Sequence, residues 1–228
     1  ILIADIIPAR FVRQNYHGWK AWPAEMKQLT HGLPVVFSNS YQRASKYWFY
    51  TGQHTYSLNF YRERKNNYNF WPIEDSLLGK PVYYLDKYEL WRFKDSLQTP
   101  LGWIGYRYYP SFLSFARIKV NTDEKKMESR AGEPVALHCS FDIPDNYYRI
   151  IHSSAGLQDT TRIGVFADGE WLKDILTSVS LREVIPGRNF ILQFDPALPK
   201  GEYYLRFAIS CCGLPPTHNS DKIKLIIN

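Results

Sequence analysis

The residues of this sequence best suited to binding chemistry lie in two polar stretches, 38–42 and 59–71. Arginines in the second stretch suit bidentate contact with a phosphate or carboxylate, and the aromatic rings among them can stack on the apolar face of a sugar. Small polar residues of the first stretch precede an expected helix, whose N-terminal N–H groups favour an anion. The candidate ligand-binding residues are Ser38, Asn39, Ser40, Gln42, Asn59, Tyr61, Arg62, Arg64, Asn67, Tyr68 and Trp71.

A shared pocket requires that the strands before these loops, 34–37 and 55–58, lie side by side and run in parallel. Both loops then emerge at the carboxyl edge of one sheet, where ligands bind in open α/β proteins. Such a pocket suits a sugar that carries a phosphate. The alternative interpretation of 59–71 is an ordinary solvated loop whose aromatic rings are buried in the core.

Signatures of other site types are missing from the sequence. The six histidines show no metal-site spacing with one another and no nearby cysteine, so we expect no bound metal. The loop after 34–37 reads Ser-Asn-Ser instead of G-x-G-x-x-G, so we expect no dinucleotide and no other cofactor. The G-x-S-x-G nucleophile motif does not occur either, and we assign no catalytic residue.

Composition favours a folded, basic protein with more than one core. The chain has 228 residues, of which 45% are hydrophobic and 16% aromatic, and this length suits two domains. Its net charge of +6 favours partners that bear phosphates or carboxylates, such as anionic lipid headgroups or lipid-linked sugar phosphates. The cationic residues form no polybasic tail, so we expect no nucleic-acid partner. Nucleic-acid binding would rest on charge alone and would weaken steeply with salt.

The first half repeats one pattern: a helix, a glycine, a short link and a strand. A glycine after each helix supplies a left-handed residue, and strands that alternate with helices predict a parallel sheet. We therefore expect a small α/β domain over residues 1–109, in which the aromatic, irregular stretch 88–109 is an edge element and connector. The expected helices are 22–30, 41–50 and 73–78, and the expected strands are 34–37, 55–58 and 81–85.

Residues 110–228 change in character and favour a second domain built from strands. Asp168-Gly169 is a strong hairpin signal, and residues 121–130 are expected to form an exposed charged turn. Antiparallel strands with regular turns and no long helix predict an immunoglobulin-like β-sandwich. The expected strands are 115–120, 134–143, 163–167, 170–172, 189–195, 202–210 and 222–227.

Three cysteines, Cys139, Cys211 and Cys212, fit no metal spacing. Alternation places Cys139 and Cys211 on inward faces of their strands, so an oxidising compartment would permit a disulfide between them. Buried free thiols are the alternative. A bond between the adjacent Cys211 and Cys212 would be strained.

The stretch PVVFSNSYQRASKYWFYTG, followed by TYSLN and by an arginine-rich loop that closes on NYNFWP, resembles a known family. It is similar to the soluble C-terminal region of bacterial membrane glycosyltransferases of the protein O-mannosyltransferase and aminoarabinose transferase superfamily, in a variant associated with Bacteroidetes. The likeness is firmest over residues 34–85 and extends more loosely through GEYYLRFAIS and GLPPTHNSDKIKLII.

The resemblance implies a non-catalytic periplasmic domain pair at the inner membrane. In such proteins a membrane-embedded part uses a polyprenyl-phosphate sugar donor, and its catalytic acidic residue lies on a loop that no position of this chain matches. The implied partners are that membrane part, a lipid-linked sugar phosphate or glycan acceptor, and the anionic membrane surface. The alternative is a freestanding carbohydrate-binding module or sugar-active enzyme.

Overall fold

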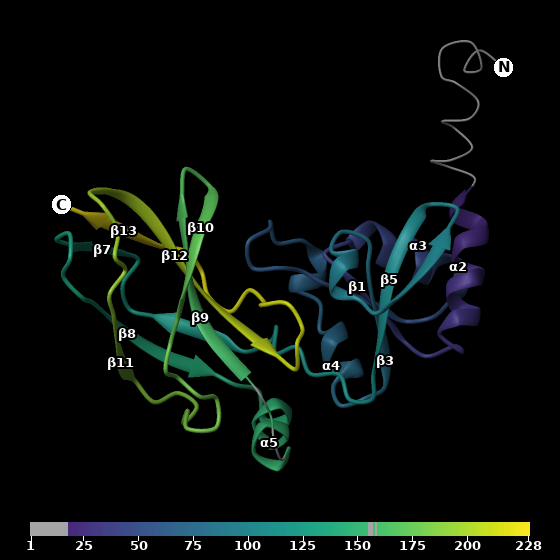
Figure 1. Ribbon diagram of the computed structural model, residues 1–228. Coiled ribbons are helices and arrows are strands. Elements are labelled where there is room, and N and C mark those ends of the chain that lie inside the picture. The colour runs from purple at the N-terminus through teal and green to yellow at the C-terminus, as the bar shows by residue number, and fades with distance from the viewer. Residues whose placement is uncertain (1–17, 155–156, 158) are drawn as a thin grey trace, which may run out of the picture. The chain divides into compact units, whose positions relative to one another are not determined.

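Three β-sheets and a few helices make up the protein, in a computed structural model that describes residues 18–154, 157 and 159–228 (Figure 1). The chain divides into two compact units. The first comprises Ile1–Leu58 and Phe70–Phe112, and the second comprises Asn59–Asn69 and Leu113–Asn228. The segment Asn59–Asn69 therefore belongs to the second unit, although the first unit flanks it in the sequence. Of the expected α/β domain, residues 1–17 lie outside the described residues.

The first unit is built on a five-stranded sheet with the order β2-β1-β3-β5-β4. β1 pairs in parallel with both β2 and β3, whereas β5 pairs antiparallel with β3 and β4. The three expected helix–strand repeats are present, with ends shifted by a few residues. The elements are α2 (Gly18–Leu29), β1 (Val35–Ser38), α3 (Tyr41–Thr51), β2 (Thr55–Leu58), α4 (Ile73–Leu77), β3 (Val82–Asp86), the 3-10 turn η3 (Leu90–Arg92), β4 (Asp95–Thr99) and β5 (Gly102–Tyr109).

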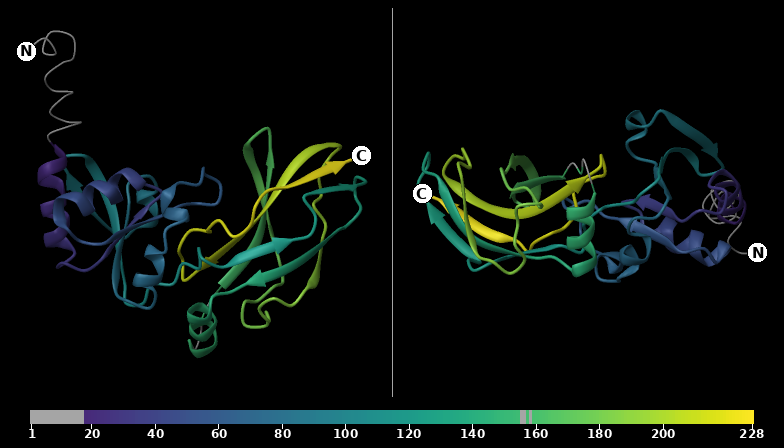
Figure 2. Two further views of the ribbon diagram at one scale, coloured as in Figure 1. Left: turned by 180° about the vertical axis from the view of Figure 1, so that it is seen from behind. Right: turned by 90° about the horizontal axis from the view of Figure 1, so that it is seen from below.

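Helices α2 and α3 cover one face of this sheet (Figure 2). The rings of Trp22 in α2 and Tyr47 in α3 both contact Phe37 in β1, with centroid distances of 5.6 and 5.8 Å. All three side chains are buried, and burial of such rings supplies much of the stability of a small core. α3 ends at Gly52, whose φ of 67° is the left-handed value expected there.

The stretch 88–109 corrects an expectation, because it is largely a regular antiparallel hairpin. β4 and β5 are joined through Thr99 and Gly102, which pair at the turn. The hairpin extends the sheet beyond β3, so that β4 is its edge strand. β4 could not be predicted from an alternation of apolar and polar residues. Four of its five residues are at least partly exposed, and both of its faces carry polar side chains.

The second unit contains a five-stranded sheet, β10-β9-β12-β13-β7, and a three-stranded sheet, β11-β8-β6. β9 and β12 run side by side along most of their length (Figure 2). The hairpin expected at Asp168-Gly169 is confirmed, with positive φ values of 50° and 87°. The elements are the 3-10 turn η2 (Asn67–Asn69), β6 (Lys119–Thr122), β7 (Lys126–Ser129), β8 (Val135–Asp142), α5 (Asp145–Ser153), β9 (Asp159–Ala167), β10 (Glu170–Leu176), β11 (Phe190–Phe194), β12 (Gly201–Cys211) and β13 (Ile223–Ile227).

Three features of this unit differ from the expectations. Residues 121–130 are not simply a charged turn, because β7 lies within them and pairs in parallel with β13. The helix α5 was not expected, since only Tyr147 and Ile151, four residues apart, bury apolar surface from it. The expected strand 115–120 also begins later, at Lys119, because Phe115 has a positive φ of 59° that a strand does not permit.

Candidate functional site

The carboxyl edge of the parallel strands is the best-positioned binding surface of the first unit. β1 lies between β2 and β3, in register through Val35 with Thr55 on one side and with Tyr83 on the other. The chain leaves β1 through α3 to reach β2, and later returns to β3 on the opposite side of β1. This reversal is the topological switch point at which ligands bind in open α/β sheets.

The loop after β1 is fixed mainly by its backbone. Asn39 has a φ of 43°, which asparagine tolerates better than most residues, and its N–H donates to the carbonyl of Leu58 at 2.9 Å. Ser40 directly precedes α3 as expected, but its side chain makes no capping bond, and its N–H donates to Ser57 Oγ at 3.1 Å. Gln42 is exposed in the first turn of α3. These backbone bonds fix the course of the chain beside the strand ends.

Two buried hydroxyls lie next to each other near this edge, and neither meets strict hydrogen-bond geometry with any of the described residues. They are Ser38 Oγ at the end of β1, where the residue is 2% exposed, and Tyr84 Oη in β3, where it is 4% exposed. Burial raises the pKa of Tyr84, and the neighbouring Ser38 hydroxyl lowers it by a smaller amount. Buried polar groups are nearly always satisfied by protein, water or ligand. The two hydroxyls interact with each other and keep further hydrogen-bonding capacity that a bound polar group would use.

Arg43 and Asp86 add opposite charges to the same edge, and the sequence did not single out either of them. Both are at most 9% exposed, Arg43 in the first turns of α3 and Asp86 at the end of β3. Burial lowers the pKa of Arg43, and the nearby Tyr88 and Asp86 partly offset this. Asp86 Oδ1 also accepts the N–H groups of Tyr88 at 2.6 Å and Glu89 at 3.2 Å. The carboxylate thus orders the loop that follows β3.

Exposed aromatic rings project from the segments around these polar groups. Tyr41 opens α3 directly after β1, whereas Tyr88 and Trp91 follow β3. Gly105 of β5 pairs with Asp86, so Trp103, two residues earlier, lies beyond the end of β3. Their exposed fractions are 45% for Tyr41, 57% for Tyr88, 81% for Trp91 and 51% for Trp103. We call these four rings, with Ser38, Arg43, Tyr84 and Asp86, the carboxyl-edge site.

The segment Asn59–Asn69 is held within the second unit by the residue Tyr61. Tyr61 is fully buried, its ring packs on Phe166 in β9 with centroids 5.9 Å apart, and its N–H donates to the carbonyl of Pro216 at 3.1 Å. Its carbonyl accepts a hydrogen bond from the guanidinium of Arg206 in β12. Burial and the bond to Asp174 raise the pKa of Tyr61 to about 12. Tyr61 is therefore an internal anchor.

Asp174 in β10 accepts hydrogen bonds from the polar groups around Tyr61. Burial by itself would raise the pKa of the Asp174 carboxyl. The hydrogen bonds donated to it, of which that from Tyr61 has the largest effect, outweigh burial and lower the pKa. Arg62 also stacks over Trp171, with its guanidinium carbon 3.4 Å from the ring centroid. The donors to Asp174 are Tyr61 Oη, Arg62 Nη2 at 3.1 Å, Arg162 Nη1 at 3.1 Å and Trp171 Nε1 at 2.8 Å. The charge of Arg62 is thus already paired.

The predicted binding residues divide between the two units. Asn59 and Tyr68 are buried, and the Asn59 amide donates to Asn66 and Asn69 at 3.0 and 2.8 Å. Arg64 and Asn67 are exposed. Those in the first unit are Ser38, Asn39, Ser40, Gln42 and Trp71, and those in the second are Asn59, Tyr61, Arg62, Arg64, Asn67 and Tyr68. The alternative interpretation was a solvated loop with buried aromatic rings. Tyr61 and Tyr68 are buried as it expects, whereas Trp71 is exposed.

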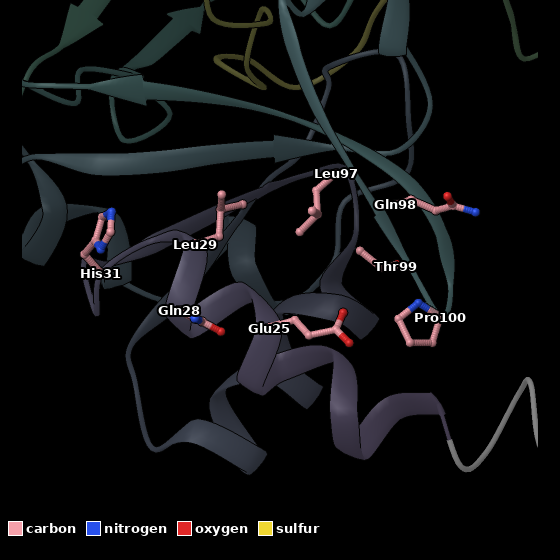
Figure 3. A pocket seen from close by; sticks show the side chains of 8 residues that line it. All are labelled: Glu25, Gln28, Leu29, His31, Leu97, Gln98, Thr99 and Pro100. Carbon is pink, nitrogen blue, oxygen red and sulfur yellow. The ribbon is translucent and has the colours of Figure 1, made fainter.

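A separate hollow of 660 Å³ lies between α2 and the edge strand β4 (Figure 3). Figure 3 shows Leu97 pointing toward Leu29 of the helix, while Gln98 points away from it. This volume lies within the range of small-molecule sites. The lining residues are Glu25, Gln28, Leu29, His31, Leu97, Gln98, Thr99 and Pro100.

Three other expectations concern cysteines, metals and the membrane. Cys139, Cys211 and Cys212 are all free thiols, so no bond joins Cys139 to Cys211 in the structure. Across the described residues, no cluster of three His, Cys, Asp or Glu side chains is arranged to hold a metal ion. None of the helices in that part of the chain has the length and hydropathy needed to cross a bilayer. No protein-family model and no curated protein matches the sequence.

Proposed function

We propose that this chain is the non-catalytic periplasmic domain pair of an inner-membrane glycosyltransferase with a polyprenyl-phosphate sugar donor, and that its carboxyl-edge site binds a saccharide of the donor or acceptor. In this proposal the first unit is a small α/β domain whose mixed sheet has the parallel part β2-β1-β3, and the second unit is an immunoglobulin-like β-sandwich. The membrane-embedded part of the same protein and the anionic membrane surface are the other partners.

The observation that carries the proposal is the set of four exposed aromatic side chains in the segments beyond the ends of β1 and β3, together with the buried Ser38 and Tyr84 hydroxyls near the switch point. A pyranose ring has an apolar C–H face that packs on a tryptophan or tyrosine ring, and this contact removes apolar surface from water. Its hydroxyls need donors and acceptors of the kind that Ser38, Tyr84 and Asp86 provide. Arg43 adds a cation next to these groups, which suits a sugar phosphate.

Binding of saccharides to the 228-residue chain tests this proposal. The probes are an oligosaccharide array and a short-chain polyprenyl-phosphate hexose in detergent, with tryptophan fluorescence as the readout. We expect binding by the wild-type chain and an affinity about tenfold weaker in Trp91→Ala, a loss of roughly 1.4 kcal/mol. Tyr88→Ala should weaken binding in the same direction, because its ring lies in the same loop.

Phe49→Ala is the matched control. Phe49 is 81% exposed, like Trp91, but it lies near the C-terminal end of α3, away from the strand ends. Its removal should leave saccharide affinity unchanged. Equal losses in Phe49→Ala and Trp91→Ala, or no binding of any probe by the wild-type chain, would overturn the assignment of this edge. Selective binding of a free glycan but not of the lipid-linked sugar would favour the freestanding carbohydrate-binding module instead.

A further inference from the structure

Strand β12 ends in two consecutive cysteines whose sulfur atoms face each other. Cys211 is the last residue of the strand and is 2% exposed, whereas Cys212 is exposed. Their Sγ atoms lie 2.8 Å apart. Neighbouring residues of an extended strand point to opposite faces, so the two thiols of such a pair normally diverge. The chain must turn at this point for the two sulfurs to meet.

The turn is made by left-handed backbone. Cys212 has a φ of 55° and Gly213 a φ of 76°, and the N–H of Leu214 donates to the carbonyl of Cys211 at 2.9 Å. Glycine adopts such a φ without strain, but for cysteine the conformation costs about 1 kcal/mol or more. The surrounding turn therefore holds Cys212 in a strained conformation that directs its thiol back toward Cys211.

The two thiols differ in acidity in a way that suits sequential reaction. The contact with the Cys211 thiol lowers the pKa of Cys212, against smaller effects of burial and of Asp159 that raise it. The same contact, with burial, raises the pKa of Cys211. Cys212 is thus the exposed thiol that ionises first, and the thiolate is the reactive form. Cys139 is different, because burial, with Glu124 and Asp123, raises its pKa to about 12.

We propose that Cys211 and Cys212 are a modification site, which a small-molecule or protein disulfide oxidises reversibly to a vicinal disulfide. The Cys212 thiolate attacks one sulfur of the oxidant, whose S–S bond breaks and whose other half leaves as a thiolate. The Cys211 sulfur then attacks the Cys212 sulfur of the mixed disulfide, whose S–S bond breaks, and the second half of the oxidant leaves as a thiolate that takes up the Cys211 proton. Two protein thiols are oxidised, and one oxidant disulfide is reduced to two thiols.

The ring that closes between adjacent residues is small, so its disulfide is strained. Strained and exposed disulfides have higher reduction potentials and are the labile ones. The bond should therefore form with an excess of a mild oxidant and open again with a modest concentration of dithiol. This reversibility separates the pair from a structural disulfide, which resists reduction.

Intact-protein mass spectrometry after treatment with oxidised glutathione tests the proposal. We expect the wild-type chain to lose two hydrogen atoms and to keep no glutathione, and non-reducing peptide mapping should place the bond within the peptide that contains both cysteines. Cys139→Ala is the matched control and should behave in the same way. In Cys211→Ser, Cys212 should instead keep a glutathione adduct, because the resolving thiol is missing. Cys212→Ser should remain unmodified, since only the buried Cys211 is left in the pair.

Three results would overturn the proposal. One is a stable glutathione adduct on Cys212 of the wild-type chain, and another is a bond that joins Cys139 to Cys211. The third is an unreacted wild-type chain under conditions that oxidise a model dithiol. Circular dichroism of each variant shows that the compared proteins are folded, and recovery of the starting mass after dithiothreitol shows that the modification is reversible. Differences in mass between the folded variants then report the reactivity of the thiols.

Discussion

The ring of Tyr61 occupies the space in which a Cβ atom on Gly164 would lie. Gly164 is in the middle of β9, more than a hundred positions later in the sequence, and its neighbour along the strand is Phe166 on the same face. The absence of a side chain lets a fully buried tyrosine approach the strand backbone. This close approach explains why Asn59–Asn69 belongs to the second unit.

Gly164→Ala should therefore destabilise the second unit. The added methyl must displace the Tyr61 ring, and overpacking of this kind costs about 1–3 kcal/mol. Urea unfolding followed by circular dichroism measures the loss. Tyr61→Ala removes the obstacle, so the double variant should be more stable than the sum of the two single losses predicts. Strictly additive losses would show that Tyr61 and Gly164 are not in contact.

Asp174→Asn should weaken the anchor of the same segment by about 1–3 kcal/mol at neutral pH, because hydrogen bonds to a charged acceptor are lost or weakened. The pKa of Asp174 is lowered in the folded protein. Its stabilising effect is therefore present above the unfolded pKa, about 3.9, and disappears as pH falls through the folded pKa. Urea midpoints of wild type and variant should differ at pH 7 and converge in acid. A constant difference at all pH values would contradict the linkage.

His218 should dominate the pH dependence of stability in mild acid. Burial, with the charges of Arg206 and Lys65, lowers its pKa from 6.5 to about 3, and Arg206 lies 3.3 Å from its Nδ1. Between the unfolded pKa of 6.5 and the folded pKa of about 3, only the unfolded chain binds a proton at His218. Stability therefore falls as pH decreases through this range. The loss should reach about 2 kcal/mol near pH 5.

His218→Gln should flatten this part of the stability profile, whereas His31→Gln, a change at an exposed position, should leave it unchanged. Urea unfolding at a series of pH values measures both variants. Titration of the His218 imidazole by NMR near its ordinary pKa in the folded protein would contradict the expectation.

Elements with strong local signals could be predicted from the sequence, and the misses have a common physical cause. β2 was predicted with its observed ends, because turn residues lie on both sides of a short run that contains the β-formers Thr55 and Tyr56. The hairpin at Asp168-Gly169 follows from the positive φ values that those residues tolerate. β4 and β7 both lie at sheet edges. Most residues of β4 and every second residue of β7 are exposed, so neither strand shows a clear apolar face. Their pairing is decided by distant strands.

The candidate site shows the same limit. Sequence reasoning placed Ser38–Ser40 at the edge of a parallel sheet, because the alternation of helices with strands and a helix N-terminus are local patterns. It missed Arg43 and Asp86, since a single charge gives no periodic signal and their proximity depends on the pairing of β1 with β3. It also assigned Tyr61 to a pocket, although the contacts of this residue with Gly164 and Asp174 span more than a hundred positions.

Asn219 links the two sheets of the second unit, and its replacement should be the most damaging polar substitution there. The residue is 1% exposed. Its Nδ2 donates to the carbonyls of Phe115 and Ile118 at 2.9 and 2.8 Å, ahead of β6. Its Oδ1 accepts the N–H of Ile209 in β12 at 2.8 Å. A single amide thus supplies two donors to the segment that leads into β6 and an acceptor to β12, and only asparagine has this combination at this length.

Asn219→Asp should lower the free energy of unfolding by about 3–5 kcal/mol, because it buries a charge and faces two carbonyl oxygens with oxygen instead of N–H. Asn219→Ala should cost somewhat less, since the abandoned groups lose partners but no charge is buried. Asn121→Asp, at an exposed position of β6, is the matched control and should stay within about 0.5 kcal/mol of wild type. Urea unfolding measures all three variants. If Asn219→Asp were as stable as Asn121→Asp, the amide would not be what joins the two sheets.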